Sequence, residues 1–141
     1  MADQALFEFM QSAVECANEI QFNAAFIEQE MPILELSEEN RGQIVATCSA
    51  LAESKHGIAH ELGELPFLNS YDGSRADLCV ARIVEIVLED LRLMRGLTDT
   101  LEADSSAGFA YTLLEGAGDN ILRKLAILRQ AASRYHDTIW G

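Results

Sequence analysis

The residues best placed to do chemistry are two histidines and two glutamates in the second quarter of the chain. Glu53, His56, His60 and Glu64 follow one another at steps of three, four and four residues. On an α-helix this spacing puts all four side chains on one face, where a His-x-x-x-His pair can chelate a divalent metal. The stripe points away from the apolar face of the same helix. We therefore interpret it first as a solvated polar face and keep a divalent-metal site as the alternative.

Two known families use similar residues in helical bundles. Ala59-His60-Glu61-Leu62 resembles the start of the motif of histidine phosphotransfer domains, which are small acidic helical bundles with an exposed histidine. In that family a lysine and a glycine follow and the helix continues, whereas here Gly63 and Glu64 follow and Pro66 comes soon after. The resemblance implies phosphoryl acceptance by His60 as an alternative function.

The spacing of Glu15 and the Glu53 to His56 pair is similar to that of ferritin-like di-iron proteins. In those proteins the glutamates and Glu-x-x-His pairs project into the bundle core. Here both groups are expected to point outward, and the last quarter of the chain contains no Glu-x-x-His pair. The sequence also has no Ser-His-Asp order, glycine-rich phosphate loop or Cys-His pair at useful spacing. We therefore expect a protein that is not an enzyme and has no required cofactor.

The elements that carry these residues are predicted to be four long amphipathic helices. The first has an apolar seam that recurs about every 3.5 residues, the mark of a helix packed lengthwise on other helices. Similar seams and helix-capping residues predict helices over about 4–31, 38–64, 75–100 and 106–137, with a loop over 66–73 that begins at Pro66. Short connections favour antiparallel neighbours. The predicted fold is all-α, an up-down-up-down four-helix bundle forming one domain over 1–141. The seam of the first helix consists of Leu6, Met10, Ala13, Ala17, Ile20, Ala24, Ile27 and Met31.

Charge and cysteine usage limit the possible partners. The chain has 23 Asp and Glu against 10 Lys and Arg, a formal net charge of −13. Such a surface repels phosphate backbones and anionic lipids, so we expect neither nucleic acid nor a membrane as a partner. No leader or membrane-spanning segment is expected, which predicts a cytoplasmic protein. Three cysteines without a short common spacing are expected to be reduced packing residues: Cys16, Cys48 and Cys79.

The outward face of the first helix is the predicted partner-binding surface. The first 40 residues contain nine Asp and Glu and no Lys, Arg or His. Phe22 and Phe26 lie one turn apart in this acidic field, and apolar anchors ringed by charge are typical of binding surfaces. A loop folded over these rings, or an irregular helix near Asn23, is the alternative. The predicted site consists of Glu15, Glu19, Phe22, Phe26 and Glu30.

The third helix has more apolar residues than one core-facing stripe requires. Its apolar arc covers about 200°, where a bundle helix needs little more than about 100°. The extra residues favour a symmetric homodimer interface, and burial inside an irregular bundle is the alternative. This predicted interface consists of Cys79, Ile83, Ile86, Leu93 and Leu97.

Lys55 lies at the centre of the apolar face of the second helix. Burial of an unpaired ammonium is costly, so its side chain is expected to extend to the edge of the bundle. A cavity for an anionic ligand is the alternative. Taken together, the sequence predicts an acidic helical module that acts by protein-protein interaction with a basic partner, as a regulator, inhibitor, adaptor or immunity-type protein. Mimicry of nucleic acid would be a special case of this function.

Overall fold

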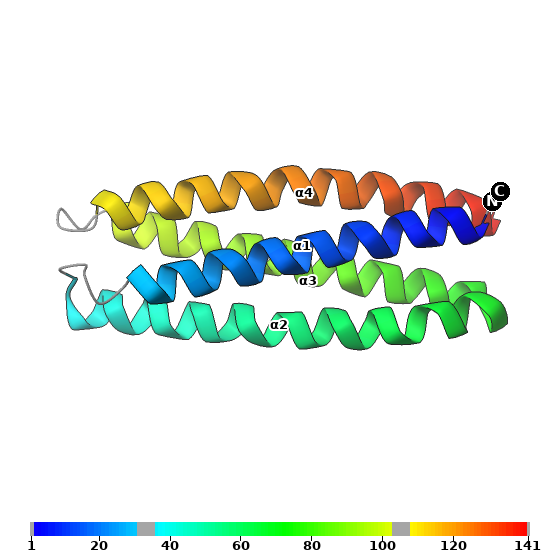
Figure 1. Ribbon diagram of the computed structural model, residues 1–141, viewed down its shortest axis with the longest axis horizontal. Helices are drawn as coiled ribbons and strands as arrows, with labels where there is room; N and C mark the ends of the chain where they lie inside the picture. The colour runs from blue at the N-terminus through cyan, green and yellow to red at the C-terminus, as the bar shows by residue number, and fades with distance from the viewer. Residues whose placement is uncertain (1, 31–35, 103–107, 141) are drawn as a thin grey trace.

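Four long helices account for nearly all of the chain that the computed structural model describes, which comprises residues 2–30, 36–102 and 108–140. They are α1 (Ala2–Glu30), α2 (Glu38–Tyr71), α3 (Gly73–Glu102) and α4 (Gly108–Trp140). The helices lie lengthwise against one another, each antiparallel to the next, and both chain ends lie at the same end of the molecule (Figure 1). The predicted four-helix bundle is confirmed.

The heptad seam of α1 is its buried face. α1 packs between α2 and α4 and also meets α3 across the bundle. Phe9 and Cys16 lie outside the predicted seam but are fully buried as well, because a helix with partners on several sides needs a wider apolar stripe than a two-helix contact. The buried members of the predicted seam are Leu6, Ala13, Ala17, Ile20, Ala24 and Ile27. Met10 is half-buried, and Met31 lies outside the described residues.

The predicted end of the second helix is wrong, because α2 continues through Pro66 to Tyr71. A proline inside a helix removes one backbone hydrogen bond and crowds the preceding turn. Tertiary contacts hold the last turns in place: Leu65 is fully buried, and the Tyr135 hydroxyl of α4 donates a hydrogen bond to Asn69. Packing and this long-range bond outweigh the local penalty of the proline.

Asp72 alone connects α2 to α3, so the predicted loop over 66–73 shrinks to one non-helical residue. The Asp72 backbone is extended, and its N–H donates to the Leu68 carbonyl, 2.7 Å away, at the end of α2. Its carboxylate accepts a hydrogen bond from the Ser74 N–H at 3.1 Å and thereby caps α3. α3 continues through Gly96 to Glu102, close to the predicted end near residue 100.

The three cysteines are free and buried, which confirms that they pack in the core and form no disulfide. The Cys48 thiol lies 3.6 Å from the Ala24 carbonyl oxygen of α1. This contact identifies the side of α2 that faces α1. Ser54 and Glu61 lie on the other side of α2, since both contact residues of α3.

Candidate functional site

Phe22 and Phe26 form an aromatic pair on the outside of α1. Their ring centroids are 6.4 Å apart and their planes differ by 12°, so the rings are stacked. Phe22 is 67% exposed and Phe26 is half-buried. α1 runs unbroken through Asn23, whose side chain donates to the Glu19 carbonyl at 2.8 Å, so no helical irregularity turns the rings inward. A large aromatic ring is therefore presented to solvent by a regular helix.

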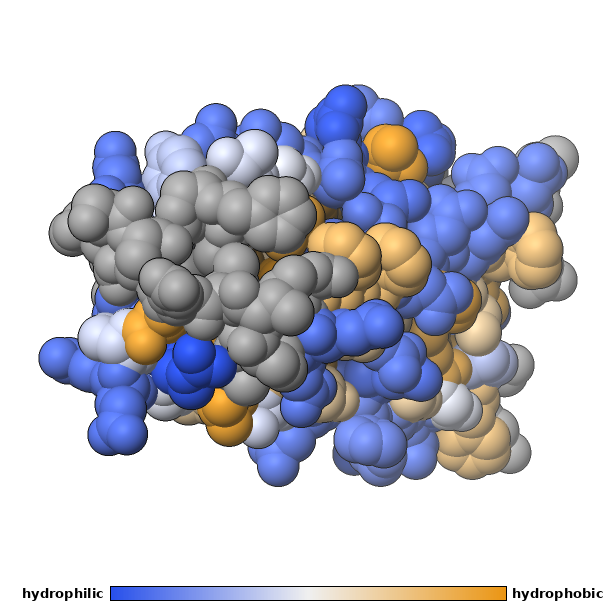
Figure 2. Space-filling model, turned by 60° about the vertical axis from the view of Figure 1, so that its left-hand side comes forward, coloured by the Kyte–Doolittle hydropathy of each residue, from blue (hydrophilic) through white to orange (hydrophobic). Residues whose placement is uncertain are grey.

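The acidic residues beside this pair lie along the edge between α1 and α4. Glu15 is exposed and Glu19 is half-buried, whereas the Glu30 side chain lies outside the described residues. Two turns before Glu15, Glu8 forms an ion pair with Arg134 of α4 at 3.6 Å. Figure 2 shows apolar side chains that reach the surface among strongly hydrophilic ones. The predicted partner site thus combines aromatic rings with carboxylates, and Arg134 of α4 neutralises Glu8 farther along the same helix.

The extra apolar stripe of α3 lies mostly inside the bundle. Cys79, Ile83 and Leu97 are buried by the other helices of the same chain. Ile86 and Leu93 are half-buried and pack against the core. A second copy could not reach the three buried residues unless the bundle opened, so this stripe does not form the predicted open dimer surface.

The polar stripe of α2 faces solvent along its length. Glu53, His56, His60 and Glu64 are all exposed. Among the described residues, no three His, Cys, Asp or Glu side chains are grouped closely enough to hold a metal ion. The third histidine of the chain, His136 of α4, lies beside Asp77 of α3, with Nδ1 3.0 Å from Oδ1.

The continuation of α2 changes the comparison with histidine phosphotransfer domains. His60 is exposed and lies well before the end of an unbroken helix, as that resemblance requires. The expected interruption at Pro66 does not occur. Gly63 and Glu64 still replace the lysine and glycine of the motif.

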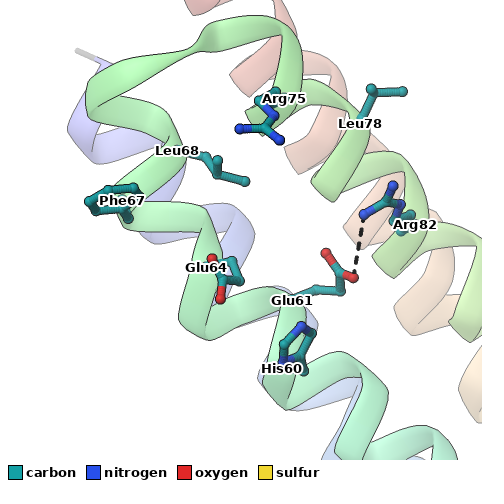
Figure 3. A pocket seen from close by; sticks show the side chains of 8 residues that line it. All are labelled: His60, Glu61, Glu64, Phe67, Leu68, Arg75, Leu78 and Arg82. Carbon is teal, nitrogen blue, oxygen red and sulfur yellow. Dashed lines mark ion pairs between the residues drawn. The ribbon is translucent and has the colours of Figure 1, made fainter.

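A groove between α2 and α3 joins His60 and Glu64 to residues that the sequence did not single out. It has a volume of about 330 Å³. Figure 3 shows Arg82 extending from α3 toward Glu61 of α2, whereas Arg75 lies closer to Leu68. Phe67, which is 61% exposed, and Leu78 add apolar surface. The full lining comprises His60, Glu61, Glu64, Phe67, Leu68, Arg75, Leu78 and Arg82.

Glu61 connects this groove to the buried core through its contacts with α3. Its carboxylate lies 3.8 Å from the Arg82 guanidinium and accepts a hydrogen bond from the buried Cys79 thiol at 3.1 Å. Burial, and secondly this hydrogen bond to Glu61, raise the pKa of Cys79 to about 12. The thiol therefore stays protonated at neutral pH and is a poor nucleophile.

Two charged residues of the apolar helix faces have different surroundings. Lys55 is half-buried, whereas Asp90 of α3 is only 2% exposed. The Ser54 hydroxyl of α2 donates to the Asp90 carboxylate at 2.6 Å. Burial raises the Asp90 pKa to about 6, although the Ser54 hydrogen bond acts in the opposite direction. The burial of Asp90 could have been predicted from the sequence, because Asp90 falls in an apolar row with Ile83, Val87, Met94 and Leu97.

The comparisons with known proteins add no further constraint on this site. Neither a protein-family model, nor a curated protein, nor a solved structure matches the chain. In the part of the chain that the structure describes, no helix is both long enough and apolar enough to cross a membrane. The residues and their geometry therefore carry the functional argument.

Proposed function

We propose that this protein is a non-enzymatic interaction module that binds a basic surface of a protein partner through the exposed side of α1. The observation that carries the proposal is the stacked Phe22 and Phe26 pair, of which Phe22 is largely exposed. Exposed aromatic anchors give binding energy when a partner covers them, and surrounding carboxylates select a cationic partner. Glu15 and Glu19 supply that charge. In this proposal the protein acts in the cytoplasm, where its three thiols stay reduced.

The test is capture of a partner by the immobilised full chain. Phe22→Asp and Phe26→Asp should each abolish capture while the circular dichroism spectrum stays helical. Phe67→Asp is the matched control, because it makes the same substitution at a phenylalanine of similar exposure on α2. Unchanged capture by both α1 variants would remove this surface from consideration.

The electrostatic part of the proposal needs a separate variant. Glu15→Gln with Glu19→Gln should weaken partner binding and reduce its dependence on salt, because fewer ionic contacts remain to be screened. Binding that becomes tighter, or keeps its full salt dependence, would show that the partner surface is not recognised through these carboxylates.

Phosphoryl acceptance by His60 is the second candidate. It is favoured by the exposed position of His60 on an unbroken helix of a four-helix bundle. In this reaction an imidazole nitrogen would take the phosphoryl group from the aspartyl phosphate of a response regulator and release the carboxylate. Phosphorylation of the parent and the His56→Gln variant, with none in His60→Gln, is the expected pattern. A parent that accepts no phosphoryl group from several regulators would end this candidate.

Divalent-metal binding by the α2 stripe is a weaker proposal on the same face. It predicts saturable zinc binding by the parent and loss of that binding in a His56→Ala, His60→Ala double variant. Equal binding by parent and variant would place the metal elsewhere.

A further inference from the structure

Between Phe7 and Ala25 one side of α1 is exposed and has no charged residue, and exposed Glu28 follows at the next step of three. Its members recur at steps of three and four residues, so they form a single row. All of them are exposed in the structure. We call this row the neutral stripe: Phe7, Gln11, Val14, Asn18, Gln21 and Ala25.

The N-terminal half of the neutral stripe is apolar and hollowed. Phe7 is 65% exposed, and Phe7, Met10, Gln11 and Val14 line a hollow of about 390 Å³. A partner could therefore cover both the exposed Phe7 ring and the apolar hollow beside it. Glu15 borders the stripe on the side toward α4, because Gln11 and Asn18 lie four residues before and three residues after it.

The neighbouring side of α2 extends this surface without adding a carboxylate between Val45 and Ala59. Val45, Ala52 and Ala59 are exposed and recur every seven residues on the same side of α2 as Cys48, which faces α1. Lys55 is half-buried beside them and adds a cation, not a carboxylate. Small side chains make this surface flat enough for close approach of another helix.

The distribution of charge on the chain indicates which partner would cover the neutral stripe. A second copy brings the same formal charge of −13, so faces that carry carboxylates repel each other when two copies approach. When the neutral stripes of two copies face each other, no carboxylate within one stripe lies against a carboxylate of the other. Burial of Phe7 and Val14 can then stabilise the contact without that repulsion. A basic partner, by contrast, gains no ionic contact from a surface without carboxylates. We propose that the neutral stripe and the adjoining face of α2 form a homodimer interface with a second copy of this chain.

The test combines light scattering with size-exclusion chromatography of the full chain. The parent should elute with twice the 15.5 kDa chain mass. Val14→Glu with Gln21→Glu places carboxylates on both copies of the interface and should give a monomer with an unchanged helical spectrum. Ile127→Glu is the matched control: it adds a carboxylate at an exposed apolar position on α4 and should remain a dimer.

A charge-exchange experiment provides a second test of the proposed interface. Val14→Lys with Gln21→Lys should also give a monomer, and mixing it with the glutamate variant should restore a dimer of mixed composition. A monomeric parent, a dimeric glutamate variant or an equal loss of dimer in the Ile127→Glu control would each overturn the proposal. Partner capture through Phe22 and Phe26 is measured separately, so either idea can fail without the other.

Discussion

Asp90 makes the stability of the fold depend on pH. Its folded pKa of about 6 lies above the value of about 3.9 for an unfolded aspartate. The folded state therefore holds the proton more tightly. The contribution of this group to the free energy of unfolding is complete below about pH 4 and is lost as pH rises through about 6. At neutral pH the buried carboxylate is ionised, and it destabilises the fold.

We expect Asp90→Asn to stabilise the protein at neutral and higher pH. The amide keeps an oxygen that accepts the Ser54 hydrogen bond, but it has no charge to desolvate. The free energy of unfolding, from urea titrations, should rise by at most about 3 kcal/mol at about pH 8 and change little at about pH 4. Glu85→Gln, at an exposed site on the same helix, is the control. A gain that is equal at both pH values would contradict the titration of Asp90.

The cysteines are predicted to react only when the chain opens. Burial raises the pKa values of Cys16 and Cys48 to about 12 and about 11, and Cys79 behaves similarly. Little thiolate is therefore present at neutral pH, and reagents cannot reach it. Modification by an aromatic disulfide reagent should follow the rate of unfolding for all three thiols. An added cysteine at exposed Ser49 should react at once, and equally rapid reaction of the native thiols would contradict the burial described here.

At the scale of helices, the contact between the start of α3 and the end of α4 depends on a missing side chain. A Cβ atom at Gly73 would lie 2.8 Å from Cγ2 of Ile139. We expect Gly73→Ala to lower the free energy of unfolding by roughly 1–3 kcal/mol through this overlap. Gly63→Ala is the control, because no atom lies within 4 Å of its Cβ position. That change should raise stability by up to about 1 kcal/mol.

A double-mutant cycle tests the cause of the Gly73 effect. In an Ile139→Ala background Cγ2 is absent. Gly73→Ala should therefore lower the free energy of unfolding by less than it does in the parent. An equal cost in both backgrounds would assign the effect to the backbone of Gly73 and not to its contact with α4.

The helices could be predicted from sequence better than their ends. The α1 seam was visible because alternating steps of four and three residues record which face is buried. The extension of α2 past Pro66 was not, because it depends on the Tyr135 bond to Asn69, 66 residues away. The single-residue turn at Asp72 follows from the same extension.

The candidate surfaces show the same limit. Exposure of Phe22 could be predicted, because a helical wheel places it among outward carboxylates. Burial of Ile83 and Leu97 within one chain could not, because a wide apolar arc looks the same whether a second copy or the same chain covers it. Here α3 packs against α2 and α4 and also meets α1, so the chain itself covers the arc. The groove near Arg75 and Arg82 requires the register between two helices, which a single sequence does not record.

At the scale of the whole molecule, the balance of charge decides how salt acts on stability. The chain carries 23 acidic and 10 basic residues besides three histidines. Between helices, ion pairs join Arg82 to Glu61, Arg95 to Asp119 and Arg134 to Glu8, at distances of 3.1–3.8 Å. The arginines of these pairs are substantially exposed, and exposed pairs contribute little to stability. Repulsion among the remaining carboxylates should therefore outweigh these attractions.

We predict that the melting temperature rises when sodium chloride is added to a low-salt buffer, because screening weakens net repulsion more than it weakens the few ion pairs. Glu15→Gln should raise the melting temperature at low salt, since Glu15 contributes only to the excess charge. Arg134→Gln should lower it, because that change breaks the pair with Glu8 and adds to the net charge. Both differences should shrink as salt increases, whereas a neutral osmolyte should leave them unchanged. A melting temperature that falls with salt would mean that the pairs between helices, and not the excess of carboxylates, dominate the electrostatics of this bundle.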